Sequence, residues 1–205
     1  MLAFSGESID KALLKPAHHV LLILTLSLTI LEKWLWKLRP FNWLVKRPNV
    51  SGVYEGELQS TWIDASGNAI PPVKAFLSIH QTLLSIQIRQ YTEQSTSYSI
   101  AADFVHYGDG RVELIYTYLN DPPAVIRTTS PIHYGTAKLV VEKKSERLIG
   151  NYWTDRKTTG EVRFTRFGKG HCQSMGECEN LKSSLSGQNK RGFRGWVKAT
   201  SSRRK

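Results

Sequence analysis

Residues 83–106 read LLSIQIRQYTEQSTSYSIAADFVH, and this stretch carries the pattern that decides the fold. Apolar or aromatic residues alternate with polar ones in both halves, and a short polar run at 92–94 separates the halves. Successive side chains of a strand point to opposite faces, so this alternation is typical of a strand with one buried face. The stretch therefore predicts two consecutive strands joined by a turn.

The same pattern recurs throughout the middle of the chain, and turn residues such as 66–68 (SGN), 108–110 (GDG) and 121–123 (DPP) punctuate it. No stretch after residue 50 shows a helical period. Eight short strands in about 120 residues predict a mainly β domain, built as a small eight-stranded antiparallel barrel that can enclose one small ligand. The predicted strands are 51–60, 73–80, 83–91, 95–106, 111–119, 133–143, 147–155 and 160–168.

The start of the chain is hydrophobic. Residues 20–31 read VLLILTLSLTIL without a charge, and Trp34, Trp36 and several basic residues follow. A membrane span needs about 20 mostly apolar residues, a length reached over about 17–36. This segment predicts a membrane helix within an anchor over 1–47, and the positive-inside rule places the following domain in the cytoplasm. A signal peptide and an interfacial helix are the alternatives.

Charge is distributed unevenly along the chain. The 28 Lys+Arg and 17 Asp+Glu give a net charge of +11, yet residues 48–170 are close to neutral. A nucleic-acid-binding domain concentrates basic charge on its folded surface, so we expect neither DNA nor RNA as a partner. Residues 171–205, rich in Ser, Gly, Lys and Arg, predict a basic, disordered, low-complexity tail, with docking to anionic membrane lipids as the alternative.

The sequence lacks the short motifs of catalysis. It contains no GxSxG elbow, no HExxH, no P-loop and no GxGxxG, so we expect no catalytic residues and no enzyme. His171, Cys172 and Cys178 are three possible metal ligands without an evident fourth, so we expect no metal site. Two cysteines are too few to hold a domain of this size together as a disulfide scaffold.

Several predicted strands carry polar side chains on a shared face. One interpretation is a solvated outer face; the other is a polar cavity in which rings stack on a base, Arg pairs with phosphate, and hydroxyl or amide groups read base edges. A one-residue shift in register would reverse which side chains point inward. The candidate ligand-binding residues are Arg89, Tyr91, Ser95, Ser97, Tyr116, Tyr118, Asn120, Thr154 and Arg156.

Short motifs in a fixed order carry a resemblance that covers roughly residues 17–168. The motifs are 48–56 (PNVSGVYEG), 60–62 (STW), 93–97 (EQSTS), 116–120 (YTYLN), 133–136 (HYGT) and 150–156 (GNYWTDR). Through them the chain resembles the SMODS-associating, two-transmembrane, β-strand-rich effectors, also called CD-NTase-associated protein 15. That family usually has two membrane spans, whereas this sequence offers one candidate.

The resemblance implies a membrane-anchored effector of a bacterial cyclic-oligonucleotide antiphage system (CBASS). Its barrel, over 48–170, would bind a cyclic dinucleotide from a partner CD-NTase, with no other cofactor. Binding would drive homo-oligomerisation, disrupt the inner membrane and cause abortive infection. The alternative is a membrane-anchored lipocalin-like protein that binds a small ligand without killing the cell; such a protein would line its cavity with Leu, Ile and Phe.

Overall fold

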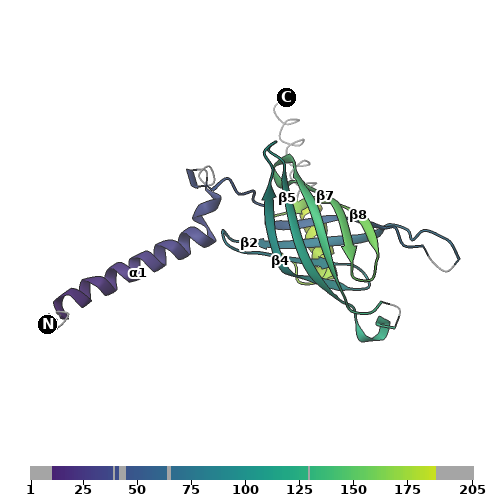
Figure 1. Cartoon of the computed structure of the whole chain (residues 1–205), viewed down its shortest axis with the longest axis horizontal. Helices are drawn as coiled ribbons and strands as arrows, with labels where there is room; N and C mark the ends of the chain where they lie inside the picture. Colours follow the sequence, from purple (N-terminus) through teal and green to yellow (C-terminus); the bar gives the residue numbers. More distant parts are fainter. Residues whose placement is uncertain (1–10, 39, 42–44, 64–65, 129, 188–205) are drawn as a thin grey trace, which may run out of the picture. The chain divides into compact units, whose positions relative to one another are not determined.

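The computed structural model describes residues 11–38, 40–41, 45–63, 66–128 and 130–187, with side chains from residue 18 onward (Figure 1). The chain divides into two compact units. The first comprises residues 1–47 with 82–84, and the second comprises residues 48–81 and 85–205. Each unit is described separately below.

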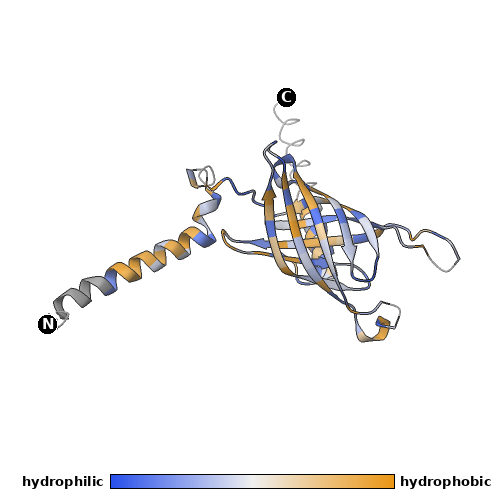
Figure 2. Ribbon diagram, viewed as in Figure 1, coloured by the Kyte–Doolittle hydropathy of each residue, from blue (hydrophilic) through white to orange (hydrophobic). Residues whose placement is uncertain are grey.

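The first unit is helical and carries the apolar run. Helix α1 spans Lys11–Lys33, and a short 3-10 turn, η1, spans Leu35–Lys37. Figure 2 shows the apolar residues following one another along α1, and Val20 and Ile23 are more than half exposed. The uncharged run ends at Glu32, which leaves it well short of the roughly 20 residues of a span.

No helix within the described residues combines the length and the apolar character needed to cross a membrane. This finding contradicts the predicted span over residues 17–36 and the predicted inner-membrane location. Both predictions counted residues 17–19 and 32–36 toward the span, although they include His18, His19, Glu32 and Lys33.

The second unit is a closed, up-and-down antiparallel barrel in which each strand pairs with the next along the chain, as predicted (Figure 1). Two 3-10 turns, η2 (Ala124–Ile126) and η3 (Lys143–Ser145), lie in its connections. The eight strands are β1 (Gly52–Ser60), β2 (Val73–Gln81), β3 (Ile86–Tyr91), β4 (Thr96–His106), β5 (Val112–Asp121), β6 (His133–Glu142), β7 (Arg147–Thr154) and β8 (Thr159–Gly168).

Pairing of β1 with β8 closes the barrel and fixes which side chains point inward. Their antiparallel register runs from Tyr54 opposite Arg166 to Ser60 opposite Gly160. Inward side chains then alternate along the strands and fill the interior. The apolar interior contains Ala75, Leu77, Ile79, Ile86, Ile88, Leu114, Leu139, Leu148, Val162 and Phe164.

One end of the barrel interior is sealed by a polar network. The Tyr54 hydroxyl lies 2.9 Å from both the Val50 and Ser145 carbonyl oxygens, and Arg166 Nε donates to it over 3.0 Å. Gln81 adds a second bridge, because its Oε1 accepts from Val50 N at 2.8 Å and its Nε2 donates to Pro48 O at 2.9 Å. Burial raises the pKa of Tyr54 to about 12, against the opposing charge of Arg166, so the phenol stays protonated at neutral pH.

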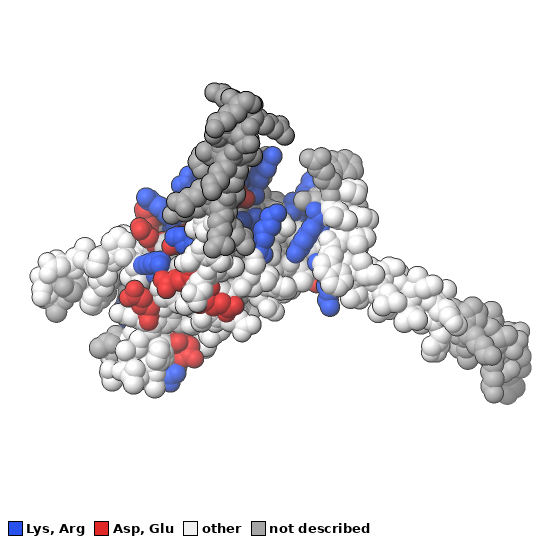
Figure 3. Space-filling view, turned by 180° about the vertical axis from the view of Figure 1, so that it is seen from behind, with Lys and Arg blue, Asp and Glu red and all other residues white. Residues whose placement is uncertain are grey.

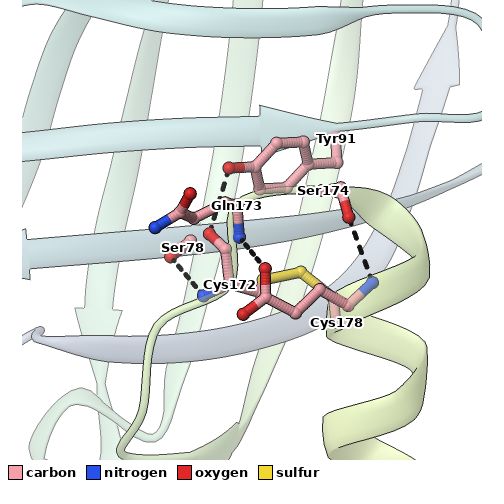
Figure 4. The surroundings of a disulfide bond; sticks show 7 residues. Ser78, Tyr91, Cys172, Gln173, Ser174 and Cys178 are labelled. Carbon is pink, nitrogen blue, oxygen red and sulfur yellow. Dashed lines mark hydrogen bonds between the residues drawn. A yellow bond between two sulfur atoms is a disulfide. The ribbon is translucent and has the colours of Figure 1, made fainter.

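A C-terminal helix over residues 175–187 follows the barrel, and this corrects part of the predicted disordered tail. Ser174 caps the helix, since its Oγ accepts from Glu177 N at 3.2 Å, while the Glu177 carboxylate accepts from Gln173 N at 2.8 Å. A disulfide between Cys172 and Cys178 ties the helix to the segment before it (Figure 4). Residues 188–205 of the predicted tail lie outside the described residues.

The outer face of β2 holds this C-terminal segment against the barrel. Alternate β2 side chains each contact it: Lys74 pairs with Glu179 at 2.8 Å, Ser78 Oγ accepts from Cys172 N at 3.2 Å, and His80 Nδ1 lies 3.4 Å from His171 Nε2. Lys182 also pairs with Glu55 of β1. The apolar part of the contact contains Val53, Phe76, Tyr91, Phe167, Cys172, Met175, Cys178 and Leu181.

Removal of the Tyr54 hydroxyl tests the sealed end. We expect Tyr54→Phe to lower the free energy of unfolding by about 1–3 kcal/mol, because two buried carbonyls and Arg166 lose a partner. Urea unfolding of the full chain measures this loss, and Tyr98→Phe, on an exposed ring, is the matched control. Equal stability of the two variants would show that the network contributes nothing.

A buried carboxylate makes stability depend on pH. Glu113 lies on the outer face of β5, where Tyr107 donates to it over 2.6 Å and Lys138 and Arg111 lie at 3.2 and 3.6 Å. The Tyr107 hydrogen bond, together with the two cations, lowers the pKa of Glu113 below its ordinary 4.5. A carboxylate with a lowered folded-state pKa stabilises the fold above its ordinary pKa, and that contribution is lost as the pH falls.

We therefore expect the unfolding temperature to decrease below about pH 4.5, and to decrease less in Glu113→Gln than in the wild type. Thermal unfolding between pH 3 and 7 measures the difference, and Glu161→Gln, at an exposed carboxylate, is the control. A Glu113→Gln profile that parallels the wild type would contradict the assignment.

Candidate functional site

The end of the barrel opposite the polar seal opens into a pocket of about 310 Å³. It lies where β1, β3, β5 and β7 end and β2, β4, β6 and β8 begin, so one strand terminus after another contributes a side chain. The pocket is lined by Leu58, Ser60, Trp62, Ile70, Val73, Gln90, Thr92, Gln94, Ser95, Ser97, Tyr118, Asn120, Ser130, His133, Tyr152, Thr154, Arg156 and Thr158.

On several strands the inward face changes from apolar to polar as the strand approaches this end. On β5 the inward residues run from Leu114 through Tyr116 and Tyr118 to Asn120, all buried. The same change occurs on β3, where Gln90 follows Ile86 and Ile88 in the inward register. The interior is therefore an apolar core beneath a polar pocket.

Two hydrogen-bond donors on β5 face the pocket. The Asn120 Oδ1 accepts from the Ser97 hydroxyl across the β4–β5 pair at 2.8 Å, which directs the amide nitrogen elsewhere. Burial raises the pKa of the Tyr118 hydroxyl, with smaller contributions from Tyr152 and Asp155, so it stays protonated at neutral pH. Within the described residues no hydrogen bond occupies the Tyr118 hydroxyl or the Asn120 amide nitrogen, so both can donate to a ligand.

Arg156 places a positive charge at the mouth of the pocket. Its guanidinium lies 3.5 Å from the Ser130 hydroxyl and 3.4 Å from His133 Nδ1. That histidine nitrogen lies closer, at 3.0 Å, to the Pro131 carbonyl oxygen. None of the carboxylates in the described residues pairs with Arg156, which leaves its donors available to an anion.

The structure brings six of the nine predicted ligand-binding residues to the pocket. Tyr116 lies deeper in the interior, with its ring 5.9 Å from that of Tyr118. Arg89 and Tyr91 lie on the outside of the barrel, where Arg89 stacks over Tyr98 and Tyr91 donates to Cys172 O at 3.0 Å. Ligand binding itself stays a prediction for all nine. The six in the pocket are Ser95, Ser97, Tyr118, Asn120, Thr154 and Arg156.

Sequence reasoning did not assign Gln90, Gln94, Tyr152 or His133 to the site, although all four line it. The sequence signal that could have identified such residues is a polar side chain near a strand end, two or four residues beyond a buried apolar one and therefore on the same face. Gln90 after Ile86 and Ile88 is such a residue, and Tyr152 after Leu148 is another.

The pocket contains nothing that resembles a metal centre. In the part of the chain that the structure describes, no three His, Cys, Asp or Glu side chains gather where they could hold a metal ion. The predicted absence of a metal and of catalytic residues is not tested by this observation.

Comparison of the chain with known proteins identifies its family. A family model described as the Cap15 cyclic dinucleotide receptor domain matches residues 45–166, which include the whole pocket. A CD-NTase-associated protein 15 from Staphylococcus schleiferi is 33% identical over 135 residues, which cover 66% of this chain and 70% of that protein. The chain therefore belongs to the Cap15 family and carries its cyclic dinucleotide receptor domain.

Proposed function

We propose that the open-end pocket binds a cyclic dinucleotide made by a partner CD-NTase, and that the chain is the receptor of a CBASS antiphage system. The observation that carries this proposal is the lining itself. Within the described residues, Tyr118 and Asn120 offer donors that no hydrogen bond occupies, and Arg156 offers a cation without a carboxylate partner. Phosphate oxygens and base carbonyls are the acceptors that such a set would recognise.

The lining also separates this proposal from an apolar-ligand carrier. Leu58, Ile70 and Val73 give the pocket one apolar side, against which the face of a base can pack. Most of the other lining side chains are polar, and each would lose hydrogen bonds to water if covered by a lipid chain. A nucleotide can pack its base against the apolar side and form hydrogen bonds with the polar side chains.

The proposed response is assembly, without turnover of the ligand and without a metal or other cofactor. A ligand shifts an equilibrium only if it binds the assembled state more tightly than the resting state. Assembly on infection would then protect the bacterial population against phage. The membrane step implied by the resemblance is not part of the proposal, because the described helices supply no span.

A thermal-shift screen of the full chain against cyclic di- and trinucleotides tests ligand class, with mild detergent present because the apolar residues of α1 are exposed. We expect one selective hit, and a ligand at 100 times its dissociation constant adds roughly 2.7 kcal/mol of stability. Arg156→Ala should weaken that ligand about 10- to 100-fold, since a hydrogen bond to a charged group contributes about 1.5–3 kcal/mol.

Arg163→Ala, on the outer face of β8, is the matched control for loss of positive charge. A folded chain that shifts with no cyclic nucleotide, or equal binding by the Arg156 and Arg163 variants, would count against the proposed pocket. Recovery of degraded nucleotide after incubation would instead show that the chain is an enzyme.

Gly135 offers a test that removes no polar group from the pocket. A Cβ at this position would lie 2.4 Å from the Tyr118 ring and hydroxyl, so the ring must shift from its position in the pocket lining. We expect Gly135→Ala to weaken ligand binding at least tenfold, as measured by calorimetry, with little change in folding. Gly108→Ala is the control, because a Cβ there meets no atom within 4 Å. Wild-type affinity in Gly135→Ala would exclude Tyr118 from the site.

A further inference from the structure

We propose that one barrel holds only half of the cyclic dinucleotide, and that a second copy of the chain, docked mouth to mouth, holds the other half. One ligand would then join two barrels. This inference rests on the proposed function, and it concerns the stoichiometry and the partner of the same pocket.

The size of the pocket gives the first argument. At about 310 Å³ it stands at the lower limit of cavities that bury a drug-sized ligand, roughly 300 Å³. A cyclic dinucleotide contains two nucleosides and two phosphodiesters, and it exceeds that size. One base with its ribose and phosphate fits this space, and the other nucleotide remains outside.

The interior offers no room for the ligand to sink further. Tyr116 and Tyr118 lie below the pocket with their rings 5.9 Å apart, and Tyr116 is 3% exposed. Beneath them the core is filled, and the network of Tyr54, Arg166 and Gln81 seals the far end. The uncovered half of the ligand must therefore project through the mouth.

Charge gives the second argument. Arg156 is the one lining side chain with a full positive charge, and no carboxylate belongs to the lining that the structure describes. A cyclic dinucleotide carries two negative phosphodiesters. A second barrel would supply a second Arg156, which matches one cation to each phosphate.

The surface around the mouth gives the third argument, because it exposes apolar side chains that no part of the described barrel covers. The β1–β2 connection exposes Trp62 and Ile63 by 48% and 58%, and the β5–β6 connection exposes Val125 and Ile132 by 86% and 46%. In Figure 3 these two connections project on the left and show few charged side chains. Apolar patches beside a ligand site are typical of surfaces that bind protein.

These features also explain why pairing would require the ligand. Two copies related by a two-fold axis would bring two Arg156 guanidinium groups toward each other, and neither pairs with a carboxylate among the described residues. Like charges repel in the empty pair, whereas two phosphates between them would turn repulsion into attraction. The ligand would thus complete a site that a single copy leaves half built.

Titration calorimetry with the cyclic dinucleotide that gives the largest thermal shift tests the inference on the full chain. We expect 0.5 ligand per chain, together with a doubling of mass in sedimentation at that ratio. A large excess of ligand should reverse the doubling, because each barrel then fills with its own ligand. One ligand per chain, in a monomer or in any assembly, would overturn the inference and leave the proposed function standing, whereas no binding at all would overturn both.

Substitutions at the rim separate docking from binding. Val125→Asp and Ile63→Asp change exposed residues that do not line the pocket, and we expect them to bind one ligand per chain, as monomers, with at least tenfold lower affinity. Val105→Asp, on the outer face of β4, is the control and should keep the ratio of 0.5. An unchanged ratio of 0.5 in both rim variants would overturn mouth-to-mouth docking.

Discussion

The pairing of β1 with β8 is the constraint on which the rest of the structure depends. It turns a twisted eight-stranded ribbon into a cylinder without edges, and it thereby decides the inner and outer face of every strand. The same two strands carry Tyr54 and Arg166, which meet at one end of the interior and seal it. The same strand pair therefore closes the barrel and seals one of its ends, which leaves the other end open for a ligand.

Much of this architecture was predictable, because alternation at period two reports both the strands and their two faces. All eight strands were placed within a few residues, and the polar residues in or directly after 95–106, 111–119 and 147–155 include six residues of the pocket. These polar residues stand at the strand ends because the apolar core needs only the middle of the barrel. A polar residue in the buried register therefore marks where the core ends.

Alternation does not say which face points inward, and the sequence predictions failed where outside contacts bury residues. Tyr91 is aromatic and buried, yet the C-terminal helix covers it from outside the barrel. That helix was missed because its stability comes from the disulfide and from ion pairs such as Lys74 with Glu179, which join residues far apart in sequence. A bulge near Ile100 likewise shifts the register of β4, and no Gly or other turn residue in the sequence indicates its position.

A barrel closed in this way has limited means of signalling that a ligand has arrived. Its hydrogen-bonded strands leave no free edge, its interior is packed beneath the pocket, and its far end is sealed, so large changes in barrel shape would break many contacts at once. The connections at the mouth are not held by the hydrogen bonds that pair the strands. A receptor of this construction therefore signals most readily by what it presents at its mouth, where the ligand and the surrounding apolar side chains together form a surface that neither provides alone.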